Sequence, residues 1–169
     1  TTVKRLVDIG LEVEVESGIG AGCDHSDIEY SESGAKIVTD KGSSLSNADF
    51  IFRVKKPPSE EISILKQGAM HLSFLDPFND SESLHAMASS GVTAVSLEMI
   101  PRTTLAQKMD ALSSQANIAG YTAVIHSADK LNKMLPMMMT PAGTISPAKY
   151  FILGIGVAGL QAIATAKRL

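Results

Sequence analysis

The clearest structural signal in the chain is the stretch Tyr150-Phe151-Ile152-Leu153-Gly154-Ile155-Gly156-Val157-Ala158-Gly159. It joins a short apolar run to a glycine-rich turn with the spacing GxGxxG, and a helical pattern of residues follows. A strand, this turn and a helix in succession are the context in which the motif binds the pyrophosphate of a dinucleotide. Gly154 permits the tight turn, Gly156 lets the backbone approach a pyrophosphate, and Gly159 lets helix and strand pack closely. The stretch therefore predicts the first unit of a Rossmann domain.

The start of the predicted helix supplies the groups that would hold the phosphates. The backbone N–H groups there, including those of Val157 and Ala158, have no partner inside the helix and lie at its positive end. An acidic residue that binds the adenosine ribose is expected about 20 residues after the motif, which places it beyond Leu169. The alternative for GxGxxG is a tight packing turn that binds no ligand.

Apolar runs typical of strands alternate with helical patterns along the chain. This alternation implies βα units and a mostly parallel sheet with flanking helices. The expected fold class is therefore α/β, with the start of a Rossmann dinucleotide-binding domain after the sheet. Residues 135–147 contain proline and glycine and predict a connection between units. The predicted strands are 11–15, 36–39, 49–54, 70–75, 92–99 and 149–153, and the predicted helices are 2–9, 27–33, 60–66, 81–89, 109–132 and 157–169.

Composition excludes several classes of protein. The chain has 169 residues, a length that predicts one domain, or one domain and part of another. Of these residues 44% are hydrophobic and 20% are charged, which excludes an intrinsically disordered protein. The net charge of −3 and the scattered basic residues argue against nucleic acid as a partner. The single cysteine, Cys23, excludes a disulfide framework and a multi-cysteine zinc site. The uncharged run 150–166 is shorter than the about 20 apolar residues of a membrane-spanning helix.

A second glycine-rich run, Gly18-Ile19-Gly20-Ala21-Gly22, also follows a predicted strand. It leads into Cys23-Asp24-His25-Ser26 and not directly into an apolar helix, so we expect a flexible turn before a helix cap. Cys23 and His25 make no metal site by themselves, because this turn offers no third ligand. No metal is therefore expected.

Polar residues gather after the fifth predicted strand. Gln107, Asp110, Ser113 or Ser114, and Asn117 recur at three- and four-residue spacing, which predicts one polar face at the start of the helix 109–132. Arg102 lies just ahead of them. One interpretation is a solvated helix face with a cap at its start. The other is a group of amide, carboxylate, hydroxyl and guanidinium that orients a carboxamide, and the residue chemistry alone leaves both open.

Four segments carry a resemblance to one known family. They are Glu16-Ser17-Gly18-Ile19-Gly20, the block from Pro101 to Tyr121, the segment Pro141-Ala142-Gly143-Thr144-Ile145-Ser146-Pro147-Ala148-Lys149, and Gly154-Ile155-Gly156-Val157-Ala158-Gly159-Leu160. Together they resemble the NAD(H)-binding alpha subunit of proton-translocating NAD(P) transhydrogenase, over essentially the whole chain. That family has two α/β domains with NAD in the cleft between them. The resemblance implies a fragment, with residues missing before Thr1 and most of the NAD-binding domain missing after Leu169.

The resemblance also implies domains, an activity and a site. Residues 1–113 would form the N-terminal α/β domain, and residues 114–169 a connecting helix and the first βα unit of the Rossmann domain. The enzyme would pass hydride reversibly between NADH and NADP, with Gln107 and Asp110 as the residues nearest the chemistry. The residues implied to hold NAD(H) are Arg102, Gln107, Asp110, Ser113, Gly154, Gly156, Val157, Ala158 and Gly159.

The same resemblance implies partners and a location. NADP(H) would lie on a partner component, and a membrane-spanning component would couple hydride transfer to proton translocation. The chain would form a homodimer at the cytoplasmic face of the inner membrane, held there through these partners and not by a membrane segment of its own.

Alanine dehydrogenase, from the same superfamily, is the nearest alternative. Those enzymes place a substrate-binding lysine after one strand and a histidine after the next. Lys55 matches the lysine, whereas Asp76 stands where the histidine would be and also departs from the aromatic residue expected in transhydrogenases. Deamination needs an acid–base group, and hydride transfer between two nicotinamides needs only orientation and exclusion of water. The sequence therefore favours transhydrogenase. A non-catalytic nucleotide-binding module is the other alternative.

Overall fold

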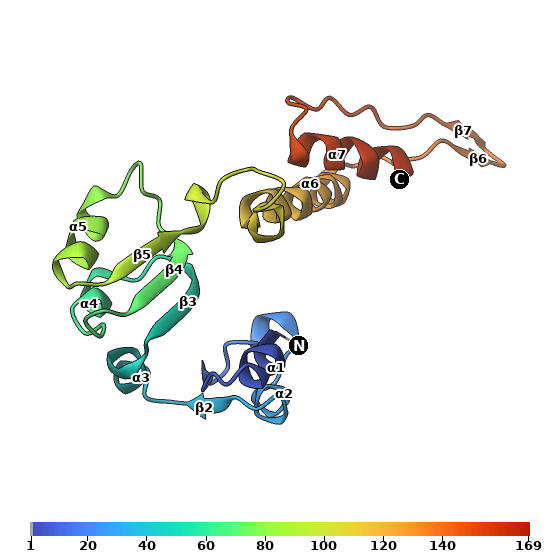
Figure 1. Cartoon of the computed structure of the whole chain (residues 1–169). Coiled ribbons are helices and arrows are strands. Elements are labelled where there is room, and N and C mark those ends of the chain that lie inside the picture. The colour runs from blue at the N-terminus through green and yellow to red at the C-terminus, as the bar shows by residue number, and fades with distance from the viewer. Residues whose placement is uncertain (1) are drawn as a thin grey trace. The chain divides into compact units, whose positions relative to one another are not determined.

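The structure is a computed structural model that describes residues 2–169, so Thr1, where the expected domain 1–113 begins, lies outside it. The contacts divide the chain into two compact units, Thr1–Ser96 and Leu97–Leu169. Helices and short parallel strands alternate through the first unit, as Figure 1 shows. The predicted α/β class is therefore confirmed. The domain boundary expected between residues 113 and 114 stays a prediction.

The first unit begins with a small parallel sheet. Strand β1 (Glu14–Glu16) pairs with β2 (Lys36–Val38), and the helices α1 (Thr2–Asp8) and α2 (Asp27–Glu32) belong to the same part of the chain. Helix α2 begins where the sequence predicts, because Ser26 and Glu29 form a reciprocal capping box at its start. The second glycine-rich run forms a turn and the short 3-10 helix Ala21–Cys23 ahead of that cap.

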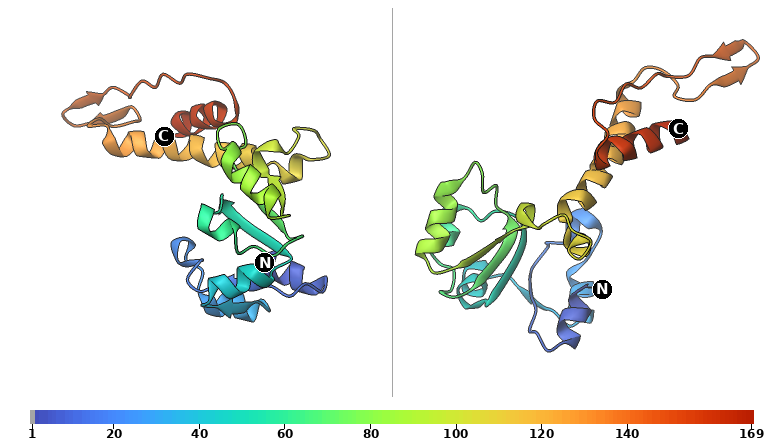
Figure 2. Two further views of the ribbon diagram at one scale, coloured as in Figure 1. Left: turned by 90° about the vertical axis from the view of Figure 1, so that its left-hand side faces the viewer. Right: turned by 45° about the horizontal axis from the view of Figure 1, so that its top comes forward.

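A second parallel sheet forms the core of the first unit. Its order is β3-β4-β5, from Phe50–Lys55, Met70–Phe74 and Thr93–Ser96. The register places Ile51 beside His71, and His71 beside Ala94. Helix α5 lies along one face of this sheet in Figure 2. The helices of this part are α3 (Lys41–Asn47), α4 (Ser59–Ile62) and α5 (Ser81–Ser89), of which α3 was not predicted.

The two faces of this sheet differ in burial. One face contributes to a buried apolar cluster with members from β3, from the helices α3, α4 and α5 and from the adjoining segments, namely Leu45, Ile51, Ile62, Leu65, Ala69, Leu75, Met87 and Val92. On β3 the alternate residues Phe50, Phe52 and Val54 are 52%, 60% and 72% exposed. Successive side chains of a strand point to opposite faces, so these three lie on the face away from the cluster.

The second unit is built around two helices that pack together. Helix α6 (Ala111–Lys130) is the longest in the chain, and α7 (Val157–Arg168) lies along it in Figure 1. The antiparallel hairpin of β6 (Met138–Thr140) and β7 (Gly143–Ile145) occupies the segment predicted as a connection. Two short 3-10 helices, Leu97–Met99 and Gln107–Met109, precede α6. The first of these replaces the end of the predicted strand 92–99.

The prediction of a strand at 149–153 is wrong. These residues have no regular structure, and Phe151 and Leu153 are both 88% exposed. A parallel strand exists only when a neighbouring strand pairs with its backbone groups, and among residues 2–169 none pairs with this segment. Across the same residues, no helix combines the length and the apolar character needed to cross a membrane.

Candidate functional site

The three glycines of the GxGxxG turn are glycines for three different physical reasons. Gly154 has a φ of +102°, a backbone conformation that side-chain-bearing residues rarely adopt. A Cβ atom on Gly159 would lie 2.1 Å from the carbonyl oxygen of Gly154, so the turn closes only around a glycine there. At Gly156, φ is −74° and no atom lies within 4 Å of where a Cβ would be. Neither the backbone nor packing therefore requires glycine at position 156.

The space in front of Gly156 suits a phosphate-bearing ligand. Gly156 is the N-cap of α7, so no side chain caps the start of this helix. The first turn of α7 carries no acidic residue. The first backbone N–H groups of α7, from Val157 onward, have no partner within the helix. The positive end of the helix dipole lies at the same place, and the basic residues Lys167 and Arg168 are at the other end. An open cradle lined by N–H groups is what a pyrophosphate needs, so the residues fit such a group.

The predicted polar face at the start of the long helix is only partly correct. Helix α6 begins at Ala111 and not at residue 109, because the Asp110 carboxylate accepts a hydrogen bond of 2.9 Å from the Ser113 backbone N–H. An N-cap residue has a non-helical backbone, and Asp110 has φ −73° and ψ 82°. Gln107 starts a separate 3-10 helix before the cap. Gln107 and Ser113 therefore do not lie on the face of one continuous helix.

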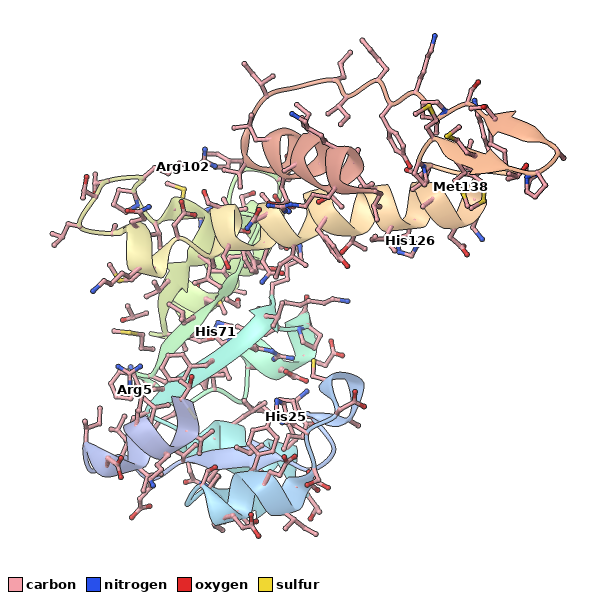
Figure 3. The ribbon with its side chains drawn as sticks, turned by 90° about the vertical axis from the view of Figure 1, so that its right-hand side faces the viewer. Arg5, His25, His71, Arg102, His126 and Met138 are labelled. Atoms are coloured by element: carbon pink, nitrogen blue, oxygen red, sulfur yellow. The ribbon has the colours of Figure 1, made fainter. Side chains whose placement is uncertain are left out.

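Electrostatics link Asp110 to its neighbours at this cap. Hydrogen bonds from the side chain and the backbone of Ser113 hold the pKa of Asp110 below its usual value, and the positive charge of Arg102 acts in the same direction. Arg102 and Gln107 are exposed, whereas Asp110 and Ser113 are half-buried. Figure 3 shows the Arg102 side chain beside the loop that leads into α6. The carboxylate is therefore ionised, held by the helix start and close enough to Arg102 to feel its charge.

All predicted site residues belong to the second unit, in two groups. One group, Arg102 to Ser113, surrounds the start of α6, and the other, Gly154 to Gly159, forms the start of α7. The packing of α7 on α6 connects the two groups.

Sequence reasoning missed one residue at this helix contact. Gly120 is buried in the middle of α6, and a Cβ there would lie 2.2 Å from the carbonyl oxygen of Ala158. A signal was present, because a glycine inside a strong helical pattern is unfavourable and calls for a packing reason.

Lys55 and Asp76, on which the sequence-based choice between transhydrogenase and alanine dehydrogenase depends, lie in the first unit. Lys55 is the last residue of β3, and Asp76 follows β4 with a positive φ of 53°. The neighbouring Lys56 forms an ion pair of 2.5 Å with Asp80, the N-cap of α5. His71 of β4 is fully buried, and burial is the main cause that lowers its pKa. Across residues 2–169 no group of three metal-binding side chains occurs.

Comparison with known proteins places this chain in a family. Residues 1–119 match the family described as alanine dehydrogenase/PNT, N-terminal domain, and residues 123–169 match alanine dehydrogenase/PNT, C-terminal domain. An NAD(P) transhydrogenase subunit alpha from Rhodospirillum rubrum is 43% identical over 99% of this chain and 45% of that protein. The protein of the same name from Rickettsia prowazekii is 46% identical over 97% of this chain and 44% of its own length.

Solved structures agree with these relatives. The crystal structure of transhydrogenase from Sinorhizobium meliloti superposes with a TM-score of 0.95 and 48% identity, covering 99% of this chain and 50% of that one. An L-alanine dehydrogenase superposes with a TM-score of 0.82 at 23% identity, which shows a shared fold. The chain spans about half the length of the relatives it matches. The resemblance to transhydrogenase alpha subunits is thus confirmed, and the chain belongs to the alanine dehydrogenase/PNT family.

Proposed function

We propose that this chain is the NAD(H)-binding part of a transhydrogenase that passes hydride between NADH and NADP. The observation that carries the proposal is Gly156, whose open surroundings at the start of α7 leave room for a pyrophosphate, and which neither its backbone conformation nor its packing requires to be glycine. Relatives named as transhydrogenase subunits, at 43% and 46% identity, support the same choice. A packing turn without a ligand would explain Gly154 and Gly159 but not Gly156.

The residues of the chain would bind and orient the nucleotide, and none would move a proton. The bound NADH supplies the hydride. The N–H groups at the start of α7 hold the pyrophosphate, and the Arg102 guanidinium donates to the carboxamide oxygen of the nicotinamide. Asp110, ionised and fixed by Ser113, accepts from the carboxamide amine. Gln107, on its own short helix before the cap, reaches toward the second nucleotide.

The proposal includes partners that the chain does not contain. NADP(H) binds to a second component, and a membrane-spanning component couples hydride transfer to proton translocation. The chain itself works as a homodimer at the cytoplasmic face of the inner membrane, attached through these components.

The test is to mix the full-length protein with an NADP-binding transhydrogenase component and to follow hydride transfer from NADH to an NADP analogue by absorbance. Transfer between the two nucleotides supports the proposal. Reduction of NAD by alanine, without transfer between nucleotides, would identify an alanine dehydrogenase instead. Binding of NADH with neither reaction would identify a non-catalytic nucleotide-binding module.

A further inference from the structure

In the middle of α6, Gly120 lies against the backbone of Ala158 at the start of α7. A Cβ atom on Gly120 would lie 2.2 Å, 2.9 Å and 3.0 Å from the carbonyl oxygen, the carbonyl carbon and the Cα of Ala158. All three neighbours are backbone atoms, so no side-chain rotation can relieve the contact. Gly120 therefore lets the backbone of α7 approach α6 more closely than any other residue type allows.

The helix itself does not call for a glycine at this position. Gly120 is an interior residue of α6, far from both caps, and its φ is not in the left-handed region. Glycine is the poorest helix former after proline, because its backbone loses the most freedom on folding. The contact with Ala158 is the physical reason for it that the structure offers.

The partner of Gly120 is part of the glycine turn. Ala158 lies inside GxGxxG, between the open Gly156 and the closely packed Gly159. The contact of Gly159 with the Gly154 carbonyl closes the turn on itself at the start of α7. Its place on α6 is set where Ala158 meets Gly120.

We propose that Gly120 is a positioning residue that seats the dinucleotide-binding turn on α6. The inference rests on the proposed function, since it assumes that the turn binds a nucleotide. Helix α6 carries Asp110 and Ser113 at its start and Gly120 at its middle, so one rigid element sets the spacing between the two groups of site residues. A Cβ at position 120 has to retreat by about 1 Å to reach an ordinary contact, because packed atoms do not interpenetrate.

The experiment replaces Gly120 by alanine in the full-length protein, with Ala119→Ser as the matched control. The control adds one heavy atom at the neighbouring position, which is exposed. Affinities for NADH, ADP and adenosine are measured by calorimetric titration, and melting temperatures are measured in parallel. Hydrogen–deuterium exchange of the amides from 154 to 160 is followed without nucleotide.

Displacing the turn removes at least one hydrogen bond from its N–H groups to a phosphate, and such a bond contributes about tenfold to a hundredfold in affinity. We therefore expect Gly120→Ala to bind NADH and ADP at least about tenfold more weakly, while its adenosine affinity stays close to that of the parent. Its melting temperature should fall but the variant should still fold, because the added Cβ overpacks the contact with Ala158. Exchange at 154–160 should rise in Gly120→Ala and stay unchanged in Ala119→Ser. Adenosine carries no phosphate, so it reports damage to the rest of the site and not displacement of the turn.

Unchanged NADH and ADP affinities in Gly120→Ala would overturn the positioning role. An equal loss for adenosine, or a variant that does not fold, would overturn it as well, because the effect would then lie in the fold and not in the turn. If the unmodified protein binds neither NADH nor ADP, the proposed function fails. In that case, faster exchange of the amides 154–160 in Gly120→Ala still supports the role of Gly120 in positioning the turn on α6, and unchanged exchange refutes that role.

Discussion

Replacing Gly156 by valine should separate nucleotide binding from folding. The backbone at Gly156, with φ −74°, is open to any residue, and no atom lies within 4 Å of the Cβ position. Valine is a poorer N-cap than glycine, which costs about 1 kcal/mol or less of stability. The protein should therefore fold, with a melting temperature slightly below that of the parent.

The same substitution should weaken NADH binding strongly. The new side chain fills the space that the pyrophosphate has to enter, so at least one hydrogen bond from the start of α7 is lost. A hydrogen bond to a charged group contributes about 1.5–3 kcal/mol, which corresponds to about tenfold to a hundredfold in affinity. Calorimetric titration of NADH against the folded variant measures this loss directly.

Two comparison variants sharpen the result. Gly22 of the other glycine-rich run, in the first unit, also has no atom within 4 Å of its Cβ position, so Gly22→Val makes the same change outside the turn and should leave NADH affinity unchanged. Gly159→Ala should instead destabilise the fold by about 1–3 kcal/mol, because its Cβ meets the Gly154 carbonyl. NADH affinity that is unchanged in Gly156→Val would refute the assignment of the turn to a pyrophosphate.

Three other predictions concern the cap of α6, the ion pair between Lys56 and Asp80, and the buried His71. Gln107→Asn or Asp110→Asn should slow single-turnover hydride transfer at least about tenfold, which corresponds to a barrier change of about 1.4 kcal/mol. The loss of NADH affinity should be smaller for Gln107→Asn than for Arg102→Ala. Stopped-flow measurements check both expectations. Lys56 and Ser83 lower the pKa of Asp80 to about 2, so its contribution to stability is complete above its usual pKa of 3.8 and lost as pH falls through about 2. The free energy of unfolding of Asp80→Asn should thus depend less on pH below about pH 4 in urea titrations. The pKa of His71 is lowered by burial, so the unfolded chain protonates first and stability should fall below about pH 6.5, a dependence that His71→Leu should abolish in the same assay.

Much of the fold can be predicted from local patterns. Helix α5 occupies the predicted residues, and α2, α6 and α7 begin or end within two residues of their predicted bounds, because periodicity and caps are properties of neighbouring residues. Strands β2, β3 and β4 lie within one residue of their predicted bounds, whereas β1 begins three residues later than predicted. The glycine spacing at 154–159 is by itself enough to identify the candidate site and to predict separate reasons for its glycines.

The errors arise where partners distant in sequence decide. The apolar run 149–153 has the composition of a strand, but a strand needs a neighbour to pair with, and none of the described strands pairs with it. The polar spacing from Gln107 to Ser113 suggested one helix face, but the hydrogen bond between Asp110 and Ser113 starts the helix after Gln107. The hairpin Met138–Ile145 depends on pairing between two short segments that carry no clear alternation.

Sequence alone was enough for the class of fold and for the glycine turn, because both follow from the spacing of nearby residues. Tertiary structure decided that the turn packs against Gly120 of the long helix. That contact depends on what lies opposite the Cβ position of Gly120, and the atoms there come from a residue nearly forty positions further along the chain. The spacing of nearby residues does not show which distant segments pack together, so this contact could not be predicted from the sequence.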